Sequence, residues 1–125
     1  MPKKLYFVVH DHKARQHHHD LRLEMEGVLK SWAIPKRIDV KKLHDRRLAV
    51  QVDDHSIKYG AFEGTIEEGK YGAGDVKIWD SGNYEILELE ENKKIIFNLE
   101  GKKLKGEFAL IHFRKGPEWL FFKKK

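Results

Sequence analysis

The 125-residue chain contains no cysteine. Without cysteine, neither a disulfide framework nor a zinc site built from thiolates can form. No apolar run approaches the roughly 20 residues of a membrane-spanning helix, and no apolar segment of signal-peptide length follows the N-terminus. These absences lead us to expect a cytoplasmic protein with no membrane partner.

Two motifs of phosphate and ester chemistry are also missing. The glycine-rich segment EGKYGAGDVKIW lacks the G-x-x-x-x-G-K-[ST] pattern of a phosphate loop, and strand-forming residues follow where a helix would be needed. We therefore interpret its glycines as turns or bulges that lead into a strand. No Gly-x-Ser-x-Gly elbow occurs, which argues against a covalent serine hydrolase.

Charged residues are abundant and make up 36% of the chain, against an average of about 25%. The 25 Lys and Arg outnumber the 20 Asp and Glu, which gives a formal net charge of +5 and a pI of about 9.3. This balance suits a polyanionic partner such as nucleic acid, although a lysine-rich surface can equally be a solvated face. We expect residues 1–125 to form one domain, because a chain of this length can bury a core of its own.

Alternation of apolar and polar residues is the dominant pattern along the chain. In the segment HDLRLEM, Leu21, Leu23 and Met25 share one face of an expected strand, and the polar residues share the other. Further strands are expected at Leu5–Val9, Val28–Ile34, Asp75–Trp79, Tyr84–Glu88, Ile95–Leu99, Glu107–Phe113 and Trp119–Phe122.

Turn signals lie between these strands, at Glu26-Gly27, Asp80-Ser81-Gly82-Asn83, Glu100-Gly101 and Lys115-Gly116-Pro117. Helix is expected only over Lys41–Asp45 and around Lys13–Gln16. Short strands at this spacing predict a mainly β fold, a small antiparallel β-barrel with one or two short helices.

The segment RRLAVQVDDH alternates as well. We expect Leu48, Val50 and Val52 on its apolar face. The opposite, polar face then carries Arg47, Asp53 and His55, and we expect it to line the same cavity as the polar face of HDLRLEM.

Five of the eight histidines lie in one stretch, HDHKARQHHHDLRLE, at residues 10–24. On a strand, residues i and i+2 point the same way about 6.6 Å apart, so His18 and Asp20 can lean onto one ion. His12 could supply a third ligand, while His17 and His19 would point away. Two imidazoles and one carboxylate leave positions open on a divalent metal, as a catalytic site requires.

Arg22 and His55 both suit phosphate. A guanidinium binds phosphate through a bidentate fork, and an imidazole can donate a hydrogen bond or a proton near neutral pH. A metal, an arginine and a histidine around one pocket describe a phosphoryl-transfer site. Two alternatives remain open from the residues alone, an incidental solvated histidine cluster and a surface salt bridge of Arg22 with Glu24 or with an acidic residue across the strand.

Four segments of the chain, in order, resemble the 3'-phosphoesterase domain of bacterial and archaeal DNA ligase D: FVVHDHKARQHHHDLRLEMEGVLKSWAIPK, RLAVQVDDHSIKY, FEGTIEEGKYGAGDVKIWDSG and KLKGEFALI. The resemblance covers essentially the whole chain, and EGKYGAGDVKIWDSG is its most specific part. It implies a small β-barrel and a manganese-dependent enzyme, with other divalent metals such as Co2+ as substitutes. Such an enzyme removes a 3'-terminal ribonucleoside from a primer strand and then hydrolyses the remaining 3'-phosphate to a hydroxyl.

The resemblance also implies the site residues and partners. It assigns the metal ligands to His12, His18 and Asp20, catalytic and phosphate-binding roles to Arg22 and His55 with Tyr59 beside them, phosphate binding to Arg47 and Lys36, and a supporting role to Asp53. The partners implied are a DNA or RNA strand with a 3' ribonucleotide or 3'-phosphate end, and the ligase and polymerase of end-joining repair.

The chain departs from the family pattern at one of these positions and at three neighbouring histidines. Asp53 stands where glutamate is expected. His10, His17 and His19 replace residues that are not usually histidine, and they could form adventitious metal sites.

Two other functions are compatible with parts of the pattern. A cupin-like non-haem metal oxygenase also uses a His-x-Asp pair with another histidine, although its third ligand normally lies far downstream. A non-catalytic nucleic-acid-binding barrel would use its aromatic residues to stack on bases.

Overall fold

The computed structural model describes residues 4–70 and 73–124. Within these ranges the chain forms the strands β1 (Leu5–Lys13), β2 (His17–Met25), β3 (Val28–Ile34), β4 (Arg47–His55), β5 (Gly64–Ile66), β6 (Gly74–Glu90), β7 (Lys94–Glu100), β8 (Lys105–His112) and β9 (Glu118–Lys123), with one 3-10 turn, η1 (Ile57–Ala61). The predicted mainly β fold is confirmed. In the same ranges, no helix has the length and apolar character needed to cross a bilayer.

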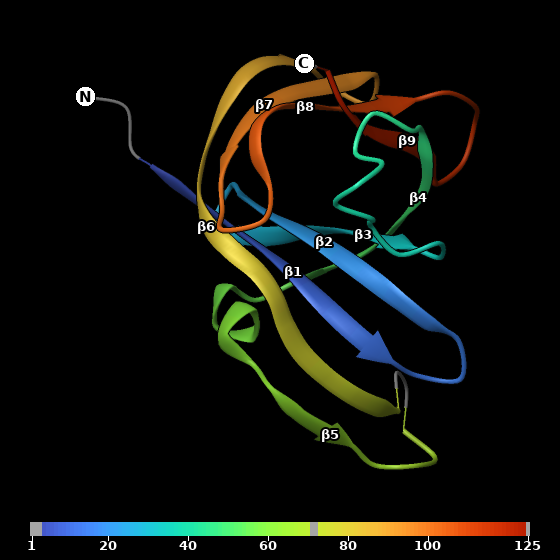
Figure 1. Ribbon diagram of the computed structural model, residues 1–125. Coiled ribbons are helices and arrows are strands. Elements are labelled where there is room, and N and C mark those ends of the chain that lie inside the picture. The colour runs from blue at the N-terminus through green and yellow to red at the C-terminus, as the bar shows by residue number, and fades with distance from the viewer. Residues whose placement is uncertain (1–3, 71–72, 125) are drawn as a thin grey trace.

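Eight of the strands close into an antiparallel barrel in the order β1-β2-β3-β4-β9-β8-β7-β6, and β6 pairs back onto β1. Strand β6 is 17 residues long, pairing with β1 along its first part and with β7 along its second. Figure 1 shows it running the height of the molecule, while η1 and β5 lie outside the closed barrel. Closure pairs the strand edges that an open sheet would expose.

The barrel encloses one hydrophobic core. Its largest buried side chains include Trp32, Phe97 and Phe108, and the Phe108 ring stacks on that of Phe121 at 5.4 Å between centroids. Leu21 and Leu23 of β2 lie in this core, as the alternation of that strand predicts. The polar residues between them must therefore point to the outer surface of the barrel.

The expected alternation of β4 is inverted. Ala49 lies in the core, whereas Leu48 is 41% exposed. A β-bulge in the β3–β4 register, opposite Leu29 to Ser31, inserts an extra residue before His55. Because a bulge shifts the side-chain parity, His55 emerges on the outer side of the barrel, while Arg47 shares the inner side with Ala49. The prediction that Arg47 and His55 share one strand face is wrong.

The two predicted helices are also wrong. Residues 41–45 form hydrogen-bonded turns, and the Asp39 carboxylate accepts the backbone N–H of Lys41 at 2.9 Å. Such a local bond offers the backbone an alternative to a helix. Residues 14–16 form the short connection between β1 and β2. The 3-10 turn at Ile57–Ala61 was not predicted.

The predicted turn at residues 80–83 lies inside β6 instead. The Asp80 carboxylate accepts the backbone N–H groups of residues 102, 103 and 104 at 2.8–3.1 Å, and so holds the turn between β7 and β8. A Cβ on Gly82 would lie 2.3 Å from the carbonyl oxygen of Glu100. These turn-forming residue types therefore serve close packing between strands.

The glycine-rich segment leads into β6 as expected. Gly74 has φ 133°, and a Cβ there would lie 2.1 Å from the carbonyl oxygen of Lys13. Tyr71 and Gly72, which we also interpret as part of a turn, lie outside the residues that the structure describes.

Candidate active site

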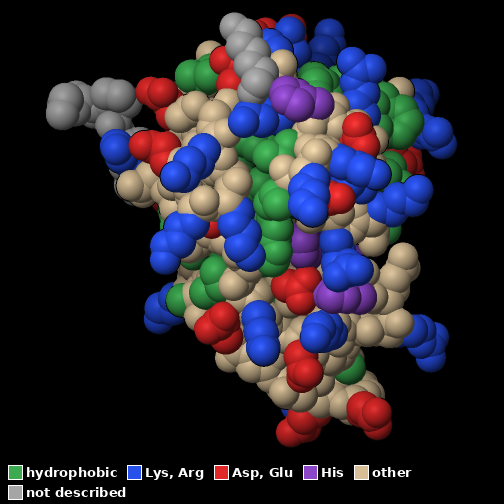
Figure 2. Space-filling model, viewed as in Figure 1, with side chains coloured by type: hydrophobic (Ala, Val, Ile, Leu, Met, Phe, Trp, Pro, Cys, Tyr) green, Lys and Arg blue, Asp and Glu red, His purple; other side chains and the backbone are tan. Residues whose placement is uncertain are grey.

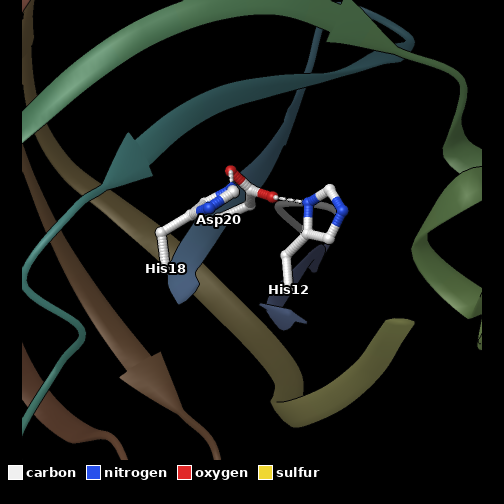
Figure 3. A group of neighbouring side chains, drawn as sticks. All are labelled: His12, His18 and Asp20. Atoms are coloured by element: carbon white, nitrogen blue, oxygen red, sulfur yellow. Dashed lines mark ion pairs between the residues drawn. The ribbon is translucent and has the colours of Figure 1, made fainter. Parts of the chain in front are cut away.

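The candidate metal ligands converge on the outer side of the β1–β2 hairpin. His12 comes from β1, and His18 and Asp20 come from β2. Their ligand atoms all lie within 4.8 Å of one another, and together they could hold a metal ion. Asp20 lies between the two imidazoles, with Oδ2 3.5 Å from Nδ1 of His12 and Oδ1 3.3 Å from Nε2 of His18 (Figure 3).

The strand register explains this convergence. His12 and His18 are direct cross-strand partners, and their ring centroids are 4.8 Å apart. Asp20 follows His18 by two residues and therefore points the same way. Two imidazole nitrogens and a carboxylate, gathered on one surface, form a donor set that fits a divalent transition metal with open positions.

The charges of this group are set by its own contacts. Burial by itself would raise the pKa of Asp20, but hydrogen bonds with His12 and His18 and the charge of Arg22 hold that pKa well below its usual range. The hydrogen bond with Asp20 raises the pKa of His18. Asp20 is therefore an ionised carboxylate at neutral pH, ready to bind a cation.

Arg22 adjoins the metal group and is almost completely buried. Its NH2 lies 3.4 Å from Oδ2 of Asp20. Its Nε donates to Nδ1 of His10 at 3.0 Å, and its NH1 donates to Oγ of Ser31 at 2.9 Å. Burial lowers the pKa of Arg22, yet a guanidinium stays charged at neutral pH. The site thus combines a fixed positive charge with a candidate metal centre, which together suit an anionic ligand.

His55 reaches Arg22 because of the bulge in β4. Its Nδ1 lies 3.1 Å from NH1 of Arg22 and 3.0 Å from the carbonyl oxygen of Asp53. This nitrogen can accept from Arg22 or donate to the carbonyl, but not both at once. The first state leaves the ring proton on Nε2 and the second leaves Nε2 as an acceptor. Burial, and then the charge of Arg22, lower the pKa of His55 and favour the neutral ring.

Tyr59 covers this cluster from η1. The Arg22 guanidinium lies 4.9 Å from the centroid of the Tyr59 ring, the His55 ring lies 4.7 Å from it, and Phe62 stacks on it at 5.3 Å. The turn sits close to the barrel, since a Cβ on Gly60 would lie 2.7 Å from the Tyr6 ring. Burial raises the pKa of Tyr59, so its hydroxyl remains protonated.

His10 and Ser31 belong to this site, although neither is predicted from the sequence to take part in it. Both are fully buried behind Arg22. Burial, and then the charge of Arg22, lower the pKa of His10 to about 4, so that it serves as a neutral acceptor. An adventitious metal site at His10 does not suit this geometry, because the ring is fully buried and its Nδ1 accepts from Arg22. Its spacing of two residues from His12 was the signal that it lies on the same face.

The remaining predicted residues lie elsewhere. NH1 of Arg47 donates to the carbonyl oxygen of Lys36 at 3.0 Å, and both residues line a pocket of about 600 Å3 at one end of the barrel together with His17 and His19. None of the residues that line this pocket belongs to the metal group or to the Arg22 cluster. Asp53 contacts His55 through its backbone carbonyl, and the residue itself is exposed.

Comparison with known proteins shows the family to which the chain belongs. A family model described as the DNA Ligase D 3'-phosphoesterase domain matches residues 10–112. The chain belongs to this family. The matched range includes the metal group, Arg22, His55 and Tyr59, and membership of a 3'-phosphoesterase family supports a phosphoesterase, that is, a hydrolase.

Several curated relatives align with nearly all of the chain. The chain is 44% identical over 129 residues to the multifunctional non-homologous end joining protein LigD of Mycolicibacterium smegmatis, covering 95% of the chain and 17% of that protein. It is 43% identical over 128 residues to LigD of Pseudomonas aeruginosa, covering 97% of the chain and 15% of that protein. The LigD of Mycobacterium tuberculosis, named as a DNA repair protein, is 43% identical over 117 residues, which cover 91% of the chain and 15% of that protein. The chain therefore spans about one sixth of the length of these relatives.

Proposed function

We propose that residues 1–125 act as a single metal-dependent domain that processes the 3' ends of nucleic-acid strands. In this proposal it removes a 3'-terminal ribonucleoside as a phosphodiesterase, and then removes the 3'-phosphate as a phosphomonoesterase to leave a 3'-hydroxyl. The observation that carries the proposal is the contact between the two halves of the site, where Asp20 of the metal group lies 3.4 Å from the buried guanidinium of Arg22. One phosphate could therefore meet a metal and an arginine at once.

His12, His18 and Asp20 would hold Mn2+, which would supply Lewis-acid stabilisation of charge on a phosphate oxygen. Arg22 binds further phosphate oxygens through its N–H donors. Tyr59 keeps the guanidinium in place from above. His55, in the neutral state that leaves the proton on Nε2, would hold a phosphate oxygen through a hydrogen bond. As the imidazolium, with Nδ1 donating to the carbonyl oxygen of Asp53, it would protonate the leaving oxygen as water replaces that oxygen at phosphorus.

Lys36 and Arg47 take a different part in this proposal. They lie in the separate pocket at the end of the barrel, so we assign them to the phosphates of the strand backbone and not to the phosphate that reacts. Lysine and arginine side chains flank a central strip of hydrophobic and histidine side chains on the face drawn in Figure 2. Contacts of this kind make binding sensitive to salt.

We further propose that the strand ends belong to end-joining repair, since the relatives are named for non-homologous end joining. The ligase and polymerase of that process would then be partners of this chain. We also propose cytoplasmic action, Mn2+ as the preferred ion and Co2+ as a substitute.

The site favours this proposal over the two alternatives. A metal oxygenase has no need of a buried arginine held by His10, Ser31 and His55 beside its metal. A non-catalytic barrel that binds nucleic acid by stacking has no need of a converged His-His-Asp group.

The decisive experiment uses two primer–template substrates, one ending in a 3'-phosphate and one in a 3' ribonucleotide. Each is incubated with the purified protein, with and without Mn2+, and the products are resolved on a gel. We expect conversion to a 3'-hydroxyl only with Mn2+, and none with the His18→Ala variant. Oxygen consumption with Fe(II), or binding without cleavage in the presence of Mn2+, would contradict the proposal and support the respective alternative.

A further inference from the structure

The inner side of the β1–β2 hairpin carries three polar side chains that the proposed function does not use, Asp11, His17 and His19. Successive residues of a strand point to opposite sides, so these three lie back to back with the candidate metal ligands His12 and His18. In the strand register, Asp11 is paired with His19, and His12 is paired with His18.

One carboxylate oxygen joins the three side chains, which we call the hairpin clamp. Nε2 of His17 lies 2.8 Å from Oδ1 of Asp11, and Nε2 of His19 lies 3.0 Å from the same oxygen. The clamp is anchored to the rest of the barrel through His19. The backbone N–H of Ile38 donates to Nδ1 of His19 at 2.9 Å, and the Trp79 ring lies 4.7 Å from the His19 ring.

This hydrogen-bond pattern identifies the clamp as a structural device and not as a second metal centre. Because the N–H of Ile38 occupies the lone pair on Nδ1, the proton of the neutral His19 ring is on Nε2, where it donates to Asp11. A metal ion would need that Nε2 lone pair. The expectation that His17 and His19 could form an adventitious metal site therefore does not suit the geometry found.

The position of the clamp in the sheet indicates what it holds. The pairing between β2 and β3 ends at His19 and Ile34, so His17 and His18 have only β1 as a neighbouring strand. Figure 1 shows this end of the β1–β2 hairpin extending beyond β3. Strand β1 is itself paired on its other side with β6 as far as Lys13. The candidate ligand His18 thus lies on a sheet edge, where the ladder fixes the backbone from one side only.

We propose that the hairpin clamp holds His18 opposite His12 and thereby sets the metal affinity of the candidate site. Asp11, His17 and His19 are positioning residues in this inference, which rests on the proposed metal-dependent function. Partners that orient metal ligands are typically worth about 10–100-fold in metal affinity. Since the clamp acts through the backbone of the hairpin, we expect an effect near the lower end of that range.

The test compares three variants of the whole chain in calorimetric titrations of metal-free protein with Mn2+. Asp11→Ala removes the shared acceptor and should weaken Mn2+ binding about tenfold. Asp11→Asn keeps an acceptor oxygen and should bind Mn2+ with nearly wild-type affinity. Asp39→Ala is the matched control, because Asp39 lines the same pocket but accepts from the backbone N–H of Lys41 and not from the clamp. It should leave the affinity unchanged.

A second readout needs no metal. Amide hydrogen exchange of residues 17–19 should be faster in metal-free Asp11→Ala than in wild type, with the exchange of the other strands unchanged. If Asp11→Ala does not fold, His17→Ala takes its place, because His17 is partly exposed and its loss leaves the core intact.

Each outcome decides a separate point. Wild-type Mn2+ affinity in Asp11→Ala, or in His17→Ala where it takes the place of that variant, would overturn the inference. An Asp11→Asn variant that binds Mn2+ as weakly as Asp11→Ala would also overturn it, because the loss of the negative charge alone would then account for the effect. If the wild-type protein binds no Mn2+ at all, the metal-dependent function fails and the clamp's role in metal binding fails with it. Hydrogen exchange would then still show whether the clamp holds the hairpin.

Discussion

The guanidinium of Arg22 carries a buried positive charge whose contacts are mostly neutral. Burial, and then the charge of Arg22, lower the pKa values of both His10 and His55, which favours neutral rings. Ser31 accepts as a hydroxyl, and the carboxylate that pairs with the guanidinium is that of Asp20, at 3.4 Å. Because only one anion lies beside Arg22 in the part of the chain that the structure describes, its guanidinium can bind a second anion. Phosphate is the ligand that this residue suits best.

Replacing Arg22 by lysine tests whether turnover needs the bidentate geometry of the guanidinium or only its positive charge. Lysine keeps the charge but cannot donate to His10 and Ser31 in the planar geometry of a guanidinium. We expect Arg22→Lys to lose about 10²-fold or more in turnover and Arg22→Ala to lose at least as much, with Mn2+ affinity retained. Phosphate release from a 3'-phosphate primer, measured beside a Mn2+ titration, checks both. Wild-type turnover in Arg22→Lys would show that charge alone suffices.

Replacing His55 separates binding from chemistry. His55 contacts Arg22 but lies outside the group of side chains that could hold the metal. His55→Ala should therefore keep its Mn2+ affinity and lose about 10²–10⁴-fold in turnover, the usual scale of acid–base assistance. Lys58→Ala, on the adjoining turn, serves as the control and should behave as wild type. If His55→Ala turns over normally, the catalytic role is rejected, whereas a loss of Mn2+ binding would make His55 a metal ligand.

At the scale of elements, alternation in the sequence predicts β2 well and β4 badly. The β1–β2 and β2–β3 ladders run without register shifts, so spacing alone places Asp20 and Arg22 on one side. In β4 the small Ala49 and not Leu48 faces the core, and a bulge between Val52 and His55 then reverses the parity for His55. Nothing in the sequence of that strand marks either feature. Asp80 and Gly82 were misassigned because residue types that suit a turn also suit a tight contact between strands, and only the contact partners distinguish the two cases.

The inverted parity of β4 makes a prediction about stability. Leu48→Lys should change the free energy of unfolding by no more than about 0.5 kcal/mol, since that side chain faces solvent. Ala49→Leu should destabilise the protein by about 1–3 kcal/mol, because the added methylenes overpack the core. Urea unfolding of the two variants and wild type measures both. If Leu48→Lys were instead the more destabilising of the two variants, Leu48 would face the core, as the alternation in the sequence predicts.

At the scale of the whole molecule, the barrel folds around two histidines that must stay neutral. His10 and His19 are buried on opposite sides of the β1–β2 hairpin. Burial is the largest cause that lowers the pKa of each to about 4, from an ordinary value of 6.5. Below pH 6.5 the unfolded chain therefore binds more protons at these residues than the native barrel does, which favours unfolding.

The metal-free protein should accordingly lose stability as the pH falls from about 6.5 to about 4, the interval between the unfolded and folded pKa values of these histidines. Thermal unfolding in the presence of a chelator, at several pH values, measures this loss. His10→Gln removes one of the two groups while its amide oxygen can still accept from Arg22, so its melting temperature should depend less steeply on pH. An equally steep dependence in this variant would exclude His10 as a source.

The candidate metal ligands lie close together in the chain, all between residues 12 and 20. The entropy lost on closing a loop grows with its length, so a denatured chain can gather ligands this close at little cost. An ion that binds both the denatured and the native chain stabilises the native one only by the difference between the two affinities. Manganese should therefore raise the melting temperature by less than its affinity for the barrel alone implies. The same proximity would let the ion join β1 to β2 before β6 returns to close the barrel.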